Sequence, residues 1–253
     1  MNTCRIVSIV AALSALAPVT AAQISPIQEA PALGMEAVQP VMDRPILAHV
    51  IFNELEGRWN GSNTEFRWDG EGWVGTDYDK LWIKSEGTLQ SNGTLDDGQQ
   101  QFLYSRAVTT YFDLQGGLRS DIDSRPTRNW AALGIQGLAP YFFDLELTGY
   151  ASGEGHLAAK LEASYDLLLT QRLILQPQIE LNLYSKADPA RLVGAGFSDI
   201  DTGLRLRYEI SRNFAPYIGA VYEGKFGQTA SYAKREREST GDFRLAFGVR
   251  IWF

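Results

Sequence analysis

Alternation of apolar and polar residues dominates the chain from about residue 48 to its last residue, 253. The final thirteen residues, 241–253 (GDFRLAFGVRIWF), are the clearest case. Strand side chains point alternately to opposite faces, so this stretch predicts a strand with one strongly apolar face. The apolar face would carry Phe243, Leu245, Phe247, Val249, Ile251 and Phe253, and the other face Arg244, Ala246, Gly248, Arg250 and Trp252. A membrane barrel would leave the apolar face to lipid; the alternative is the last strand of a β-sandwich.

The same alternation recurs often enough to predict about twelve strands. It is cleanest in residues 157–167, 173–183 and 200–209, where no charge falls on the apolar face. A lipid-facing Arg or Lys at mid-depth costs roughly 2–4 kcal/mol, so a membrane barrel would exclude it. The pattern therefore favours an all-β, transmembrane, antiparallel up-and-down β-barrel over a sandwich.

The connections between these segments support the barrel. Tight turns are expected near residues 139–140, 170–172 and 211–213, and long polar loops at 87–99, 185–196 and 227–241. Short periplasmic turns and longer outer loops are typical of such barrels. An even number of strands would place both termini on the periplasmic side. Pro177 lies inside a predicted strand and cannot donate to a ladder, so we expect a bulge there or a break in the strand.

The N-terminal region differs from the rest of the chain. Residues 1–22 combine Arg5, an apolar stretch and a small-residue cleavage site, which is typical of a secretory signal peptide. Cleavage would remove Cys4, the single cysteine, and so exclude disulfides and thiolate metal sites. Residues 23–47 carry four prolines without periodicity and predict a disordered periplasmic segment. The barrel domain would then span residues 48–253.

Composition narrows the function. Lys and Arg number 23 against 30 Asp and Glu, and the sequence pI is about 5.0, which argues against a nucleic-acid partner. The mature chain keeps two histidines, His49 and His156. Ser152 precedes His156, but no residue at strand spacing would orient that histidine, so a Ser–His hydrolase is not expected. Asp144 and Glu146 share a face and are interpreted as salt-bridge partners. We therefore do not expect an enzyme.

The polar face of the predicted strands carries acids and bases in near balance. In a narrow barrel such charges would pair, which favours a partly closed interior over an open pore. A ring of one sign, expected for a selective channel, is not visible. The phase of residues 101–107 is ambiguous, because Phe102, Tyr104 and Arg106 share a face. The predicted lumen residues are Trp82, Lys84, Glu86, Arg106, Glu162, Glu180, Asp201, Arg205, Arg207, Glu209, Glu223 and Lys225.

One candidate metal site lies before the barrel. Met35 and Met42 are the only methionines left after signal cleavage, and His49 follows them. Thioether and imidazole groups are ligands for copper ions. The alternative is an unstructured tail in which these residues are incidental.

Several segments carry a family resemblance. They are 77–87 (DYDKLWIKSEG), 130–141 (WAALGIQGLAPY), 165–177 (YDLLLTQRLILQP), 203–210 (GLRLRYEI) and 214–217 (FAPY). Over residues 48–253 the chain resembles the copper-resistance protein B family. The resemblance implies a Gram-negative outer-membrane barrel that contacts lipid and binds, sequesters or exports copper ions. It also implies a periplasmic multicopper oxidase as partner.

One departure concerns the segment before the barrel. That family carries a periplasmic region rich in Met and His, whereas this segment holds only Met35 and Met42. The alternative function is a narrow passive pore or a structural barrel without metal preference.

Overall fold

The computed structural model describes residues 45–123, 125–153 and 155–253, and these form one continuous antiparallel sheet. The predicted signal peptide and nearly all of segment 23–47 lie outside the described residues. The strands are β1 (Leu47–Trp59), β2 (Thr64–Gly75), β3 (Asp79–Gln90), β4 (Leu95–Ala107), β5 (Phe112–Asp121), β6 (Arg128–Ala139), β7 (Phe143–Ser152), β8 (Leu157–Tyr165), β9 (Leu167–Leu168), β10 (Leu173–Tyr184), β11 (Gly196–Tyr208), β12 (Phe214–Lys225) and β13 (Gly241–Trp252).

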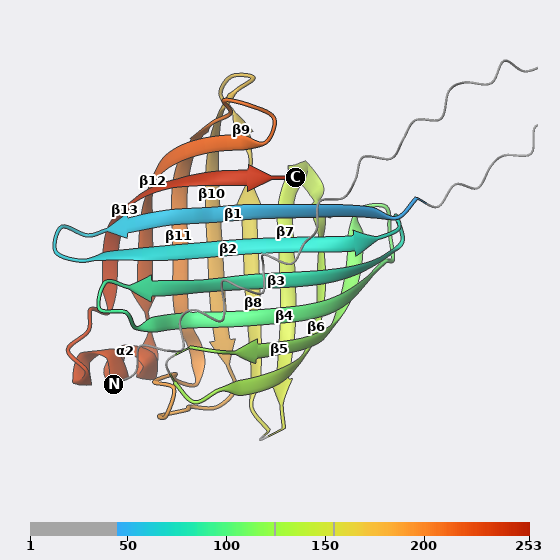
Figure 1. The fold of residues 1–253 in the computed structure, drawn as a ribbon. Helices are drawn as coiled ribbons and strands as arrows, with labels where there is room; N and C mark the ends of the chain where they lie inside the picture. The colour runs from blue at the N-terminus through green and yellow to red at the C-terminus, as the bar shows by residue number, and fades with distance from the viewer. Residues whose placement is uncertain (1–44, 124, 154) are drawn as a thin grey trace, which may run out of the picture. The chain divides into compact units, whose positions relative to one another are not determined.

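The sheet closes on itself, which confirms the predicted barrel. Neighbouring strands pair in chain order, and the last strand, β13, pairs with the first, β1 (Figure 1). At the seam the backbone N of Phe253 donates to Val50 O at 2.8 Å, and Val50 N donates back at 3.1 Å. Strands β8 and β9 both pair with β10, so counting them as one interrupted strand leaves twelve around the barrel.

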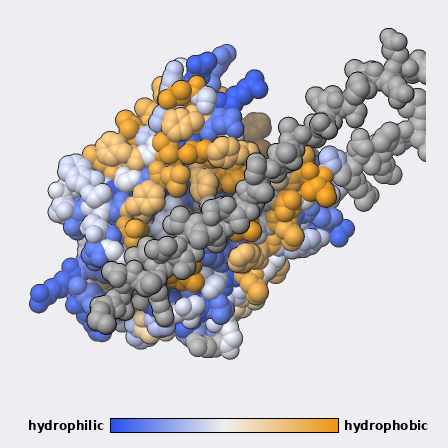
Figure 2. All heavy atoms as spheres, in the orientation of Figure 1, coloured by the Kyte–Doolittle hydropathy of each residue, from blue (hydrophilic) through white to orange (hydrophobic). Residues whose placement is uncertain are grey.

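The two faces of the wall differ as the alternation predicted. Outward-facing Phe243 is 77% exposed, Leu133 64% and Phe247 55%. Figure 2 shows such apolar side chains gathered on the barrel wall, with hydrophilic residues toward its ends. Exposure of this much apolar surface is favourable only against lipid. Within the part of the chain that the structure describes, no helix is both long and apolar enough to cross a membrane.

The two ends of the barrel differ in the connections between their strands, and we call them the terminal end and the loop end. The terminal end holds Leu47, Phe253 and short connections between strands, including the 3-10 helix η1 (Pro140–Phe142). The loop end holds the connections 185–195 and 226–240, the second of which contains helix α2 (Gly227–Arg235). The long loop predicted at 87–99 is wrong, because β3 runs to Gln90 and β4 starts at Leu95, leaving a tight turn between them.

Pro177 lies in the middle of β10, and the expected bulge is absent from the described ladder with β11, where Pro177 pairs with Leu204 in regular register. The irregularity falls on the other side. The ladder to β8 ends at Gln178 and resumes with β9 at Leu175, so it is interrupted where it would reach Pro177. Proline has no N–H to donate to a neighbour, and here the neighbouring strand is interrupted instead of the proline strand bulging.

Candidate functional site

The barrel interior is built around a buried arginine. Arg58 of β1 is 1% exposed, and its guanidinium contacts four carboxylates from β1, β11 and β12. The distances are 2.7 Å to Glu56, 3.4 Å to Glu54, 2.6 Å to Asp201 and 2.7 Å to Glu223. An isolated buried charge is very unfavourable, so this set is stable only when all members are present.

A second set of ion pairs adjoins the first toward β8 and β10. The ammonium of Lys160 lies among three carboxylates whose oxygens are all within 4.8 Å of one another. Three negative carboxylates this close together would repel one another, but two cations, Lys160 and Arg67, lie among them and offset that repulsion. The contacts are Lys160 to Glu86 (2.6 Å), Glu162 (2.5 Å) and Glu180 (3.5 Å), and Arg67 to Glu54 (3.1 Å) and Glu180 (3.2 Å).

Apolar and aromatic side chains fill the interior beside these ion pairs. Leu103, Trp130, Ala132 and Tyr150 form a buried cluster, against which Trp82 packs. The Arg119 guanidinium lies 4.6 Å from the centre of the Tyr150 ring, in cation–π range. The ion pairs and this cluster fill the interior toward the loop end, since Arg58, Lys160 and Trp130 each lie within three residues of the loop-end terminus of their strand.

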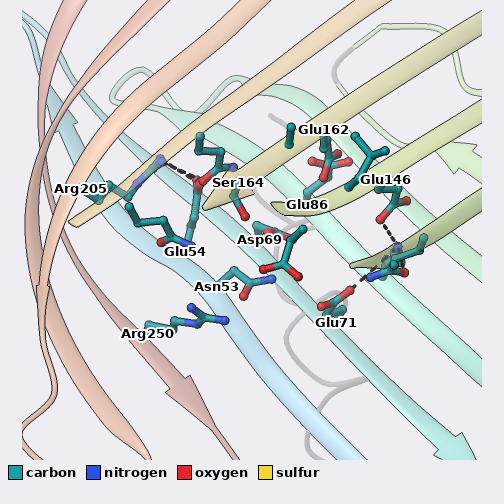
Figure 3. Close-up of a pocket in the computed structure, with 18 of the residues that line it drawn as sticks. Asn53, Glu54, Asp69, Glu71, Glu86, Glu146, Glu162, Ser164, Arg205 and Arg250 are labelled. Carbon is teal, nitrogen blue, oxygen red and sulfur yellow. Dashed lines mark hydrogen bonds and ion pairs between the residues drawn. The ribbon is translucent and has the colours of Figure 1, made fainter. Parts of the chain in front are cut away.

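Toward the terminal end the interior opens into a cavity of about 340 Å³. Figure 3 shows the carboxylates of Asp69, Glu71 and Glu86 turned toward this shared space, with Arg250 at its edge. Acids predominate over bases in its lining, so the near balance expected over all strands does not hold within this cavity. The lining carries seven carboxylates, from Glu54, Asp69, Glu71, Glu86, Asp144, Glu146 and Glu162, and three bases, Lys84, Arg205 and Arg250.

This cavity, whose lining includes these ten charged residues, is called the acidic cavity, and it offers mainly oxygen ligands. Lys84 neutralises part of the charge through Glu146 at 2.5 Å and Glu71 at 4.0 Å. Uncharged polar side chains complete the polar lining, namely those of Asn53, Ser85, Gln101, Gln136, Ser164, Gln176 and Gln178. Such a space attracts cations, because carboxylates outnumber their internal partners and the surrounding protein screens charge less than water does.

The loop end carries a latch of ion pairs, defined here as Arg191, Asp188, Asp123 and Arg128. Arg191 contacts Asp123 at 2.5 Å and also donates to the carbonyl of Pro126, while Arg128 contacts Asp188 at 2.5 Å. The latch ties loop 185–195 to the β5–β6 connection. Burial raises the pKa of the Asp123 carboxyl, although the neighbouring Arg191 opposes that rise.

The structure places most predicted lumen residues on the inward face, in four groups. Lys84, Glu86, Glu162 and Arg205 line the acidic cavity, and Arg207 and Glu209 line a second cavity at the terminal mouth. Glu180, Asp201 and Glu223 belong to the ion pairs described above, and Trp82 to the aromatic packing. Lys225 lies at the rim of the loop end, paired with Glu238 at 2.8 Å.

The predicted lumen position of Arg106 is wrong. From Gln99 to Ser105 in β4 every second side chain is buried, and Arg106 falls on the opposite, exposed face with Tyr104. The side chain lies one residue from the end of β4, where an outward arginine can reach the membrane–water interface.

Of the three predicted metal ligands, Met35 and Met42 lie outside the described residues. His49 lies on β1 opposite Trp73, with ring centroids 6.2 Å apart, and Trp73 is 6.2 Å from Trp82. This aromatic row near the terminal end was not anticipated, and the metal site remains a prediction.

Sequence reasoning also left several central residues out of the predicted lumen set. They include Arg58, Arg67, Lys160, Asp69, Glu71 and Arg250. The signal was present, since each occupies a polar position of an alternating segment.

Comparison with known proteins agrees with this architecture. The model of the family described as "Copper resistance protein B precursor (CopB)" matches residues 46–253. Copper resistance protein B of Escherichia coli is 44% identical over 213 residues, covering 84% of this chain and 72% of that protein. A copper resistance protein B homolog of Pseudomonas syringae pv. tomato is 42% identical over the same shares.

Among solved structures, the NanC porin aligns with a TM-score of 0.51 at 12% identity, over 81% of this chain and 99% of that one. This likeness concerns the fold alone. The closed barrel, the lipid-compatible wall and the family matches over most of the chain place the protein in the Gram-negative outer membrane. The chain belongs to the copper resistance protein B family.

Proposed function

We propose that this barrel contributes to copper resistance by binding copper(II) ions in the acidic cavity. One observation carries the proposal, namely that seven carboxylates face three bases in the cavity lining. Copper reaching the envelope as a divalent cation would find there both an attractive potential and oxygen ligands.

The donor set favours copper(II) over copper(I). Residues 46–253 contain no cysteine and no methionine, so the barrel offers none of the soft sulfur ligands that copper(I) prefers. Carboxylate and amide oxygens are weaker ligands and suit a cation that must also leave. For a given oxygen or nitrogen site copper(II) binds more tightly than the other divalent first-row metals, so a preference for copper needs no special geometry.

The buried ion pairs that fill the interior toward the loop end support binding and controlled transfer over passive flow. Arg58, Glu54 and Glu56 are each at most 2% exposed. A conduction path would have to pass or rearrange these ion pairs. In planar bilayers we expect little steady conductance of small ions; ohmic conductance that copper leaves unchanged would favour the passive pore instead.

The central experiment is a copper(II) titration of the purified chain, followed by calorimetry and by electron paramagnetic resonance. The double variant Glu71→Gln/Asp144→Asn removes two cavity carboxylates and should weaken binding, because it lowers both the negative potential and the number of ligands. Asp77→Asn, in an exposed turn outside the cavity, is the matched control. Met35→Leu/Met42→Leu separates any contribution of the segment before the barrel. Unchanged affinity and an unchanged spectrum in the cavity variant would refute the proposal.

We also propose, from the family resemblance, that a periplasmic multicopper oxidase exchanges copper with the barrel at its terminal end. Copurification of such an oxidase with the tagged barrel from copper-treated cells, and its loss when the terminal turns are altered, would test this.

A further inference from the structure

A second cavity, of about 310 Å³, lies at the terminal mouth. It shares one residue, Arg250, with the acidic cavity. Its lining consists of two guanidinium groups, two carboxylates and two apolar side chains. The six residues are Arg207, Arg250, Asp166, Glu209, Ile51 and Trp252, and we call their cavity the mouth pocket.

Arg250 lacks the close ion pair that the other arginines of the interior make. Its nearest carboxylate contact is Asp166 at 4.0 Å. Within the described residues, every other inward arginine of the strands has a carboxylate oxygen within 3.2 Å. Arg207, for example, lies 2.7 Å from Asp166. In Figure 3 the Arg250 guanidinium extends toward Asn53, and its Nε atom has no hydrogen-bond partner. The Arg250 side chain therefore has hydrogen-bond donors to spare.

Unpaired polar atoms concentrate at the same place. Seven buried side-chain atoms of the described residues lack a hydrogen-bond partner, and three of them belong to the mouth pocket. They are the Nε atoms of Arg207 and Arg250 and the Oδ1 atom of Asp166. Arg207 is itself only 3% exposed. A buried donor or acceptor without a partner is unfavourable, so a cluster of them indicates that a ligand supplies the missing partners.

We propose that the mouth pocket binds a small α-amino carboxylate, that is, a free amino acid. A carboxylate matches the fork of a guanidinium, so Arg250 and Arg207 would hold that end of the ligand. The ammonium group of the ligand would donate hydrogen bonds to Asp166, whose Oδ1 lacks a donor, and to Glu209, the other carboxylate of the mouth pocket. Ile51 and Trp252 would contact the aliphatic part of the ligand.

This inference goes beyond the proposed copper function and does not depend on it. The mouth pocket needs no metal, since each group of the ligand is matched by a side chain of opposite charge. Because an amino acid also chelates copper(II) through its amine and carboxylate, Arg250 would place a chelator beside the acidic cavity. The two sites can be tested separately.

The test uses the purified full chain in detergent, in buffer freed of metal by a chelator, titrated with free L-alanine in a calorimeter. We expect saturable binding in the millimolar range. Arg250→Gln and Asp166→Asn should each weaken it by about tenfold or more, because a charge-assisted hydrogen bond is worth about 1.5–3 kcal/mol and 1.4 kcal/mol is a factor of ten. Lys225→Gln, at the opposite rim, is the matched control and should bind as the parent protein does.

Three results would overturn the proposal. The first is the absence of saturable heat with the parent protein. The second is parent-like affinity in Arg250→Gln, a variant expected to fold because Arg250 makes no close ion pair. The third is binding of methylamine as tight as that of L-alanine, which would mean that the carboxylate is not recognised. The heat-dependent gel shift of a folded barrel verifies that each variant is intact.

Discussion

Replacement of Arg58 by methionine tests whether the buried ion pairs hold the barrel together. Methionine keeps most of the side-chain volume but leaves Glu54, Glu56, Asp201 and Glu223 without their shared cation. The Arg58 side chain is 0% exposed, so water cannot take its place without rearrangement. Removing one partner of a buried pair costs about 3–5 kcal/mol, and we expect a loss of that size here.

The assay is urea unfolding of the refolded barrel in lipid vesicles, followed by tryptophan fluorescence. With a denaturant slope of about 2 kcal/mol/M, a loss of about 3–5 kcal/mol lowers the unfolding midpoint by about 1.5–2.5 M. Lys225→Met is the matched control, because its pair with Glu238 is solvent-exposed on both sides and such pairs are worth about 0.2–1 kcal/mol.

A double-mutant cycle with Asp201→Asn sharpens the result. Asp201 contacts Arg58 at 2.6 Å, so the two substitutions should be less than additive, since each removes the same interaction. If Arg58→Met lowered the midpoint no more than Lys225→Met does, or if the cycle showed no coupling, the interior would not be held by these charges and the reasoning would fail.

Two further substitutions address the wall and the latch. Leu133→Arg, at an outward position 64% exposed in the middle of β6, should destabilise the barrel by about 2–4 kcal/mol in the same unfolding assay, because it places a charge at mid-membrane depth; a loss no greater than that of Leu133→Ala would contradict a lipid-facing wall. Arg191→Gln should release loop 185–195 and speed tryptic cleavage after Lys186 by about tenfold or more, given about 1.5–3 kcal/mol for hydrogen bonds to a charged group. Arg172→Gln, at the opposite end, is its control, and equal cleavage rates in both variants would contradict the latch.

The sequence shows which face of a strand each side chain occupies, but it says little about which inward side chains contact one another. Alternation assigns Phe243 and Leu245 to the lipid and Arg244 to the interior without knowledge of any neighbour, because the pleat alone decides it. Which inward charges meet depends on the stagger of twelve strands. Arg58 and Asp201 are separated by 143 residues, and no local pattern relates them.

The wrong predictions fall where the residue pattern was compatible with more than one structure. The segment 87–99 is rich in Gly, Asn and Asp, which predicted a loop, yet cross-strand pairing extends β3 and β4 through it to a tight turn. Arg106 was assigned inward on its charge, although its phase with the exposed Phe102 and Tyr104 was already visible. The excess of acids in the cavity could not be seen from a total count, because it depends on which carboxylates gather at one depth.

The pairing of β13 with β1 has a consequence for how the protein is made. The seam joins residues about 200 positions apart, so the contacts that shut the cylinder have nearly the highest sequence separation the domain allows. Until β13 has been synthesised and exported, the two edge strands stay unpaired and open to aggregation. Loss of even a few C-terminal residues should therefore block assembly at a late step instead of weakening a finished product.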